Sequence, residues 1–262
     1  MGQDKKTGTP LAKLFRKTKG FLYLMTLELR CHKWHETIGT ATVNGTQLLY
    51  SVRGPENGKP VVLLHGNGGS HKSMVTQQLE LAKAGYRVFC PDSRGQGANE
   101  PLDEYHYADM AEDTFQFIQT FGLEKPLVCG YSDGGIIALM LEMSHPGACS
   151  MIVAAGANIY PDDEGEGWEE FKKWILEQGT PLLMMMLREP DIQPHELAAI
   201  KCPALIIAGS RDLISEQHTR LIAGSIPGSE LVIVDGADHG SYIKRNPRFG
   251  RYMLDFMKRH NY

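Results

Sequence analysis

Ser132 lies in the sequence setting that most clearly suggests covalent chemistry. It is the middle residue of Gly130-Tyr131-Ser132-Asp133-Gly134, which matches the pattern G-x-S-x-G. An apolar run at 127–129 and a helix-like stretch at 134–144 flank the pentapeptide, so a sharp strand-to-helix turn is predicted there. In such a turn the glycines relieve clashes, the serine hydroxyl stands exposed, and the helix N-terminus favours negative charge. The pattern predicts a nucleophilic serine; the structural alternative is a plain glycine-rich turn.

A second glycine-rich segment, residues 65–70, follows the apolar run 61–64. Backbone N–H groups at the end of a strand can bind a developing oxyanion, and each donor stabilises such a transition state by about 3–4 kcal/mol. We assign this oxyanion hole to the backbone N–H groups of Asn67 and of Asp133, the residue after the serine. A phosphate-binding loop is disfavoured because the segment lacks both a G-K-[ST] ending and a G-x-G-x-x-G pattern. His65 is interpreted as structural.

Ten histidines compete for the role of general base, and His239 has the most favourable position. It follows the predicted strand 231–234 and precedes the last predicted helix. The carboxyl end of a late strand is the edge of the sheet where Ser132 is also expected. Three other histidines lie on predicted helices or in an insertion, where solvent-exposed side chains are expected: His106, His195 and His218.

The acid of the candidate triad is assigned to Asp212, which follows the predicted strand 204–208. A buried carboxylate at this position would hold the correct imidazole tautomer of His239 and stabilise its protonated form. Asp235 and Asp238 are alternatives, although Asp238 is the direct neighbour of the histidine and is poorly aimed toward it. A serine–histidine–aspartate triad predicts two-step acyl transfer to water from a small-molecule ester, with no metal and no organic cofactor.

Other reactions remain open for the same residues. Thioesters, amides, lactones and carbon–carbon bonds can be cleaved by the same kind of site. Dehalogenation is disfavoured because it uses a carboxylate nucleophile where this chain has Ser132. A binding protein without useful turnover is the alternative from another functional class, and the complete triad argues against it.

The elements that must position these residues follow an alternating pattern from residue 36 onward. Strand-like and helix-like stretches alternate, which is typical of a mostly parallel sheet covered by helices. Residues 37–43 and 47–52, separated by Asn44-Gly45, predict an opening β-hairpin. Further strands are predicted at 61–64, 87–90, 127–129, 151–155, 204–208 and 231–234, and helices at 70–84, 107–121, 134–144, 216–223 and 247–258.

The alternation is interrupted at about residues 157–201. This stretch contains Trp168, Trp174 and the run Met184-Met185-Met186, and no strand is evident in it. Because ligands bind outside the carboxyl ends of strands in open α/β sheets, a helical insertion here is predicted to form a small cap over the site. A helical crossover with no role in covering the site is the alternative.

Residues 1–35 are interpreted as a basic N-terminal extension, and residues 36–262 as one domain. The apolar run 21–27 is too short for a signal sequence or a membrane span. A targeting peptide or a membrane-surface helix is a less favoured alternative to an extension that lies on the domain. The net charge of −4 shows no nucleic-acid footprint, and five scattered cysteines without CxxC spacing suggest a reducing compartment. We therefore expect a cytoplasmic protein; its oligomeric state stays open.

Together, these motifs resemble the α/β-hydrolase superfamily over about residues 37–260. The segment 91–97 is also similar to the D-x-R-G-x-G turn of that family. In this superfamily the catalytic residues follow the chain order serine, acid, histidine, which is the order assigned here. The resemblance implies an α/β-hydrolase fold with a mostly parallel central sheet flanked by helices and a small helical cap insertion.

A narrower resemblance is carried by residues 130–136, 155–160 and 201–206, which are similar to the biphenyl hydrolase-like proteins, a family that includes valacyclovir hydrolase. The resemblance implies hydrolysis of α-amino acid esters, with an aspartate directly after the nucleophile holding the substrate ammonium. Asp133 occupies that position. An aspartate that caps its own helix is the structural alternative. The chain departs from the family in its N-terminal extension and its shorter, Met-rich insertion, which leaves the substrate open.

Overall fold

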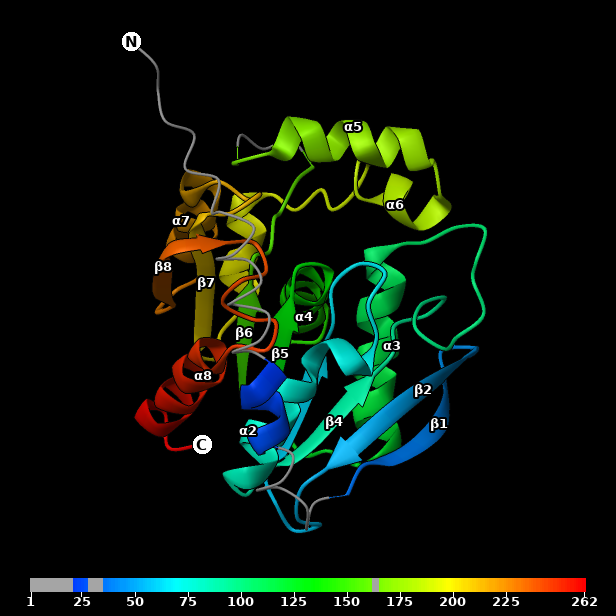
Figure 1. The fold of residues 1–262 in the computed structure, drawn as a ribbon, viewed down its shortest axis with the longest axis vertical. Coiled ribbons are helices and arrows are strands. Elements are labelled where there is room, and N and C mark those ends of the chain that lie inside the picture. Colours follow the sequence, from blue (N-terminus) through cyan, green and yellow to red (C-terminus); the bar gives the residue numbers. More distant parts are fainter. Residues whose placement is uncertain (1–20, 28–34, 162–164) are drawn as a thin grey trace.

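The computed structural model describes residues 21–27, 35–161 and 165–262. Its centre is an eight-stranded sheet with the strand order β1-β2-β4-β3-β5-β6-β7-β8, and helices cover both of its faces (Figure 1). β1 pairs antiparallel with β2, and β2 pairs antiparallel with β4. All other neighbouring strands are parallel. The predicted α/β architecture with a mostly parallel sheet is confirmed.

The predicted strands and helices are present, with ends that shift by a few residues. The strands are β1 (Thr37–Val43), β2 (Thr46–Arg53), β3 (Pro60–Leu64), β4 (Arg87–Pro91), β5 (Leu127–Tyr131), β6 (Met151–Ala155), β7 (Ala204–Arg211) and β8 (Glu230–Asp238). The helices are α2 (Val75–Lys83), α3 (Tyr107–Thr120), α4 (Asp133–Ser144), α5 (Trp168–Gln178), α6 (Pro181–Met185), α7 (Glu216–Ser225) and α8 (Pro247–Arg259), with the short 3₁₀ helices η1 (His71–Met74) and η2 (Pro194–Ala199).

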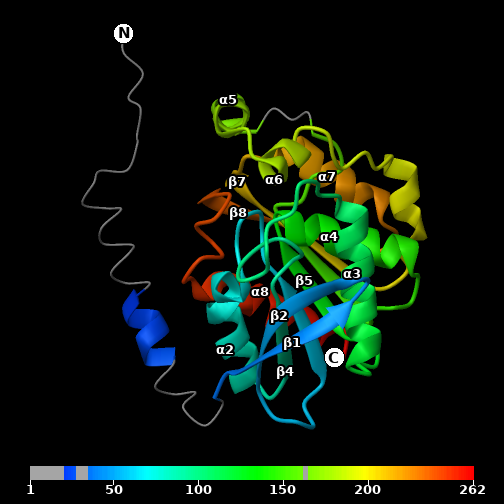
Figure 2. The same ribbon diagram turned by 90° about the vertical axis from the view of Figure 1, so that its right-hand side faces the viewer.

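Different helices cover the two faces of the sheet (Figures 1 and 2). α2 and α8 pack on one face, where Phe249 and Phe256 are fully buried in the same cluster as Leu63. α3, α4 and α7 pack on the other face, where Phe117 and Val128 are buried. The central strands β3 and β5 are therefore enclosed on both sides, which explains why their sequences are continuously apolar.

The last two strands extend further than the sequence predicts. β7 and β8 continue past their apolar cores to Arg211 and Asp238, which are register partners beyond a bulge. The prediction relied on apolar runs, whereas the ladder continues through polar residues because backbone groups form it. Asp212 directly follows β7 and His239 directly follows β8, so these two residues lie side by side at the carboxyl edge of the sheet.

The stretch between β6 and β7 contains α5, α6 and η2, which lie within the predicted cap at 157–201 (Figure 1). α5 contributes Trp168 and Phe171 to a cavity that also contains Ser132. Residues 162–164 of this stretch lie outside the described residues. The division of the chain into a main domain and a cap stays a prediction.

Residues 21–27 form a short helix beside α2 (Figure 2). Leu27 is buried against Leu79, and the Tyr23 hydroxyl donates a hydrogen bond to Glu80. Residues 1–20 and 28–34 of the predicted basic extension lie outside the described residues. Within the described ranges, none of the helices combines the length and the apolar character that crossing a membrane would need.

Candidate active site

Ser132 is the single residue between β5 and α4, and its backbone shows how tight that turn is. Its φ of 55° and ψ of −121° lie in a region that residues with side chains rarely adopt. A Cβ at Gly130 would lie 1.8 Å from the carbonyl oxygen of Gly134, and a Cβ at Gly134 would lie 2.4 Å from that of Leu64. Both flanking glycines are therefore required by close backbone approach. The turn is held to the next strand because Ser132 N donates to Ala155 O over 2.7 Å.

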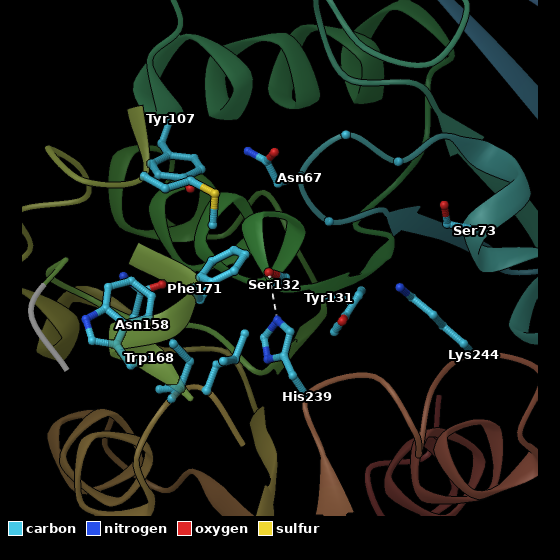
Figure 3. A pocket seen from close by; sticks show the side chains of 16 residues that line it. Asn67, Ser73, Tyr107, Tyr131, Ser132, Asn158, Trp168, Phe171, His239 and Lys244 are labelled. Carbon is cyan, nitrogen blue, oxygen red and sulfur yellow. Dashed lines mark hydrogen bonds between the residues drawn. The ribbon is translucent and has the colours of Figure 1, made fainter. Parts of the chain in front are cut away.

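The Ser132 hydroxyl lies at one end of a continuous set of hydrogen-bonded side chains. His239 Nε2 is 3.0 Å from Ser132 Oγ (Figure 3). On the other side of the ring, His239 Nδ1 is 2.5 Å from Asp212 Oδ1. Asp212 is 3% exposed, and its carboxylate also accepts from the backbone N–H groups of Gly209 and Ile214. A carboxylate fixed in this way orients the imidazole so that Nε2 faces the serine. The structure thus brings the three sequence-predicted residues together.

The alternative acids and histidines lie elsewhere. The Asp238 carboxylate is exposed and accepts from the backbone N–H groups of Gly240 and Ser241, and Asp235 is exposed as well. His106, the residue before α3, pairs with Glu189 of the stretch between β6 and β7. His195 is exposed on η2.

The expectation of a solvent-exposed side chain is wrong for His218. This residue is 3% exposed, and its Nε2 accepts from the backbone N–H of Ile159 over 3.0 Å. His218 lies on the face of α7 that is turned toward the chain after β6, and its ring packs against the ring of Tyr160. A histidine on the covered face of a helix is buried when a backbone donor satisfies its ring nitrogen.

The loop after β3 passes close to the serine. A Cβ at Gly66 would lie 3.0 Å from Ser132 Cβ, so a larger residue would require a small shift of the turn. His65 supports the loop: its Nδ1 is 2.8 Å from Gly66 O, and its Nε2 accepts from Ser93 N. These partners place the ring proton on Nδ1, and burial lowers the pKa of His65, which keeps the ring neutral. His65 thus has the structural surroundings expected of it.

The two residues predicted to form the oxyanion hole both lie near Ser132: Asn67 lines the same cavity, and Asp133 follows Ser132 in the chain. Asn67 directly follows Gly66, the residue at which the loop approaches Ser132. The backbone N–H of the residue after it, Gly68, donates to Gln96 Oε1. Asp133 is the first residue of α4, where N–H groups have no partner within the helix. Their role as oxyanion donors stays a prediction.

The Asp133 side chain is buried beneath the cavity rather than open to it. It is 2% exposed; Asn67 Nδ2 donates to its Oδ2 over 2.9 Å, and the Tyr107 hydroxyl donates to its Oδ1 over 3.0 Å. Burial raises the pKa of Asp133 to about 6, although both of these hydrogen bonds favour the ionised form. Burial and the neighbouring Asp133 also raise the pKa of Tyr107, so its hydroxyl retains the proton that it donates.

A cavity of about 330 Å³ lies over the Ser132 hydroxyl. One wall is apolar and comes from α5, from the end of α6 and from the loop after β7; it consists of Trp168, Phe171, Met186, Leu213 and Ile214. Asn67 and Tyr107, the two residues that cover Asp133, also line it. This arrangement can hold an ester with its carbonyl carbon against a nucleophile that has a base beside it.

Sequence reasoning named Trp168 only as part of the predicted cap, and it missed several other lining residues. Trp168 and Phe171 are three residues apart on α5 and therefore share a face, a spacing that could have marked them as a pair. Lys244 follows His239 within one tight turn, which could have placed it near the base. Tyr107 gave no local signal, because its contact with Asp133 depends on how α3 packs beside α4.

Comparison with known proteins places the chain in a family. Residues 59–183 match the family model of the alpha/beta hydrolase fold. The protein RutD of Variovorax paradoxus, named as a candidate carbamate hydrolase, is 35% identical over 81% of this chain and 96% of its own length. The chain belongs to the α/β-hydrolase family.

Other relatives of this α/β hydrolase are named for hydrolytic activity as well. The human protein "Serine hydrolase BPHL" is 29% identical over 85% of this chain and 87% of its own length. The crystal structure of an enol-lactonase from Burkholderia xenovorans superposes with a TM-score of 0.70 at 22% identity, covering 84% of this chain and 100% of that one. The likeness to the enol-lactonase shows the fold alone, whereas the family and its sequence relatives make this chain a hydrolase.

Proposed function

We propose that this α/β hydrolase is a serine hydrolase that cleaves carboxylic esters through a Ser132–His239–Asp212 triad and an acyl-enzyme. The observation that carries the proposal is the continuous hydrogen bonding from Ser132 Oγ through His239 to a buried Asp212 at the floor of the cavity. A neutral imidazole with Nδ1–H directed to a carboxylate has its Nε2 lone pair free to accept the serine proton. No step of this chemistry requires a metal or an organic cofactor.

Acylation begins when His239 Nε2 takes the proton of Ser132 Oγ while Oγ bonds to the ester carbonyl carbon. The carbonyl oxygen becomes an oxyanion, which the backbone N–H groups of Asn67 and Asp133 are proposed to bind. The intermediate collapses when the bond to the alcohol oxygen breaks and His239 gives its proton to that oxygen. Asp212 stays ionised and stabilises the imidazolium between these two proton transfers.

Deacylation repeats the sequence with water in place of the alcohol. His239 takes a proton from water, the resulting hydroxide bonds to the acyl carbon, and the Ser132 oxygen leaves with the proton that His239 returns. The products are the carboxylic acid and the regenerated serine. The apolar wall around Trp168 and Phe171 is suited to hold a hydrocarbon arm of the ester and to keep bulk water from the imidazole.

Exchange of Ser132 for alanine tests the proposal. We expect Ser132→Ala to lower kcat for p-nitrophenyl esters by at least about 10⁴-fold, because the nucleophile is lost while the fold is kept. Ser225→Ala, which removes an exposed hydroxyl at the end of α7, is the matched control and should turn over esters as the parent does. The panel of substrates includes thioesters, amides and lactones. Turnover by Ser132→Ala at the parent rate would remove Ser132 from the mechanism. If the parent hydrolysed thioesters, amides or lactones but not esters, that substrate class would replace the ester assignment.

A further inference from the structure

The cavity over Ser132 has two chemically different ends (Figure 3). Trp168 and Phe171 lie on one side of the Ser132–His239 pair. Ser73 and Lys244 lie on the opposite side, beyond Tyr131. An ester bound with its carbonyl at Ser132 therefore extends one arm over an apolar wall and the other toward a hydroxyl and an ammonium.

The Lys244 side chain is directed to the cavity by the turn that follows His239. Lys244 N donates to Gly240 O over 2.9 Å, which returns the chain to the vicinity of the base. The aliphatic stem passes beside Gly240: a Cβ there would lie 3.6 Å from Lys244 Cδ and 3.7 Å from its Cε. A side chain at this position would be in ordinary van der Waals contact with the lysine stem. The amino nitrogen of Lys244 points into the space between Tyr131 and Ser73 (Figure 3).

Among the residues that the structure describes, none forms an ion pair with Lys244. It is the one lining residue, among those that the structure describes, with a permanent charge. Asp133 and Asp212 are buried and accept hydrogen bonds from other donors, and the exposed Asp238 accepts from the backbone of the turn after it. Lys244 is an exposed residue that also lines the cavity, and a cation at such a position can recognise an anionic group of a ligand.

Ser73 supplies a second donor at this end. Its Oγ accepts a hydrogen bond from Ser70 N over 3.2 Å, so the position of the oxygen is fixed by the turn that begins η1. The hydroxyl proton is not used by that bond and can be donated to a ligand. An ammonium and a hydroxyl that line one cavity from separate elements can bind a carboxylate through charge-assisted hydrogen bonds.

We propose that Lys244 and Ser73 form an anion subsite, and that the substrates of this enzyme are esters with a free carboxylate on one arm and an apolar group on the other. This inference rests on the proposed ester hydrolysis and names its substrate class. Lys244 lies on a different side of Ser132 from the Asn67–Asp133 contact, so the subsite does not depend on whether Asp133 binds an ammonium.

Two matched pairs of esters test the subsite and identify the arm that carries the charge. The first pair is mono-p-nitrophenyl adipate and p-nitrophenyl hexanoate, which differ by a carboxylate on the acyl arm. The second is 4-(butyryloxy)benzoate and phenyl butyrate, which differ by a carboxylate on the leaving group. The quantity compared is the ratio of kcat/KM for the charged ester to kcat/KM for the neutral ester within each pair.

We expect Lys244→Met, which keeps the apolar stem and removes the charge, to lower this ratio about tenfold for one of the pairs. A tenfold change corresponds to about 1.4 kcal/mol. Lys244→Glu should lower the ratio further, and 0.5 M salt should reduce it in the parent because screening weakens the ion pair. Lys258→Met on the exposed face of α8 makes the same change in net charge and should leave the ratio unchanged.

The outcomes separate the two proposals. Equal ratios in the parent and in Lys244→Met for both pairs, with esters still hydrolysed, would overturn the anion subsite and leave ester hydrolysis standing. A ratio that falls equally in Lys258→Met would also overturn it, because net charge alone would then explain the effect. Lack of turnover of every ester by the parent would overturn the proposed function and this inference together.

Discussion

Among single residues, Asp133 creates an electrostatic conflict within the site. With a pKa of about 6 it is ionised at neutral pH, directly after the proposed nucleophile Ser132 and close to the proposed oxyanion donors. A negative charge there opposes the oxyanion but attracts the His239 imidazolium that forms in the same step. Asn67 and Tyr107 donate to both of its oxygens and keep the carboxylate fixed. For a substrate ammonium to contact Asp133 directly, one of these two donors has to rotate away.

Binding of a substrate ammonium by Asp133 is our proposal for α-amino acid esters, and Asp133→Asn tests it. We expect the variant to raise KM for α-amino acid esters about tenfold and to change KM for neutral esters far less, because only the charge is removed. In the parent, KM for the amino esters should rise as the pH falls through about 6, where Asp133 takes up a proton, and this rise should be absent from the variant.

Steady-state kinetics on both ester classes between pH 5 and pH 8 provide the measurement. Asp235→Asn changes an exposed aspartate near the same edge of the sheet and serves as the control. The same increase in KM for both ester classes would contradict the ammonium role.

The meeting of Ser132, Asp212 and His239 could be predicted from the sequence because each follows the carboxyl end of a strand, and parallel strands end at one edge of a sheet. Their catalytic roles stay predictions. The contacts of Tyr107 with Asp133 and the approach of Lys244 to the cavity could not be predicted, since they depend on helix packing and on a turn conformation. Side-chain types alone do not encode these distances.

Among the secondary-structure elements, β5, α4 and the loop after β3 approach one another closely at the turn between β5 and α4. Gly130 and Gly134 allow the strand and the helix to touch, and Gly66 allows the loop after β3 to reach the same point. The apolar periodicity predicted the elements that meet here, because burial on both faces dictates it. It did not predict the extension of β7 and β8 through polar residues or the division of the cap region into α5 and α6.

Gly130→Ala tests the importance of this close approach. Because its Cβ would collide with the backbone of Gly134, we expect the free energy of unfolding to fall by at least about 3 kcal/mol. Gly224→Ala is the matched control: its Cβ meets nothing within 4 Å and the residue lies in α7, so stability should rise by about 0.5–1 kcal/mol. Urea denaturation of the two variants measures both effects. A Gly130→Ala protein as stable as the parent would disprove the proposed packing of the turn.

In the whole molecule, Glu80 lies where three helices meet. It belongs to α2, accepts a hydrogen bond from Tyr23 of the helix at 21–27, and lies so close to Gly250 of α8 that a Cβ there would collide with its Oε2. That Oε2 is buried and has no hydrogen-bond partner among the described residues. Burial therefore raises the pKa of Glu80 to about 7, even though Tyr23 and nearby cations favour the ionised form.

A raised carboxyl pKa makes the folded protein less stable once the group ionises. The effect is absent below about pH 4.5, where Glu80 is protonated in both states, grows as the pH rises, and is complete above about pH 7. We expect Glu80→Gln to remove this part of the pH dependence. The free energy of unfolding of the variant, relative to that of the parent, should therefore be higher at pH 8 than at pH 4.5. Urea midpoints at the two pH values measure the gain, with the exposed Glu56→Gln as control. An identical pH profile for parent and Glu80→Gln would contradict the assignment.

The most direct test of the central claim is to locate the covalent adduct of a fluorophosphonate, a reagent that phosphonylates an activated serine. Peptide mapping by mass spectrometry should find one adduct, on the peptide that carries Ser132, and none in Ser132→Ala. The rate of labelling should fall at least about 100-fold in His239→Ala, because the general base is lost. An adduct on a different residue, or labelling of Ser132→Ala at the parent rate, would contradict the claim that Ser132 is the nucleophile of this hydrolase.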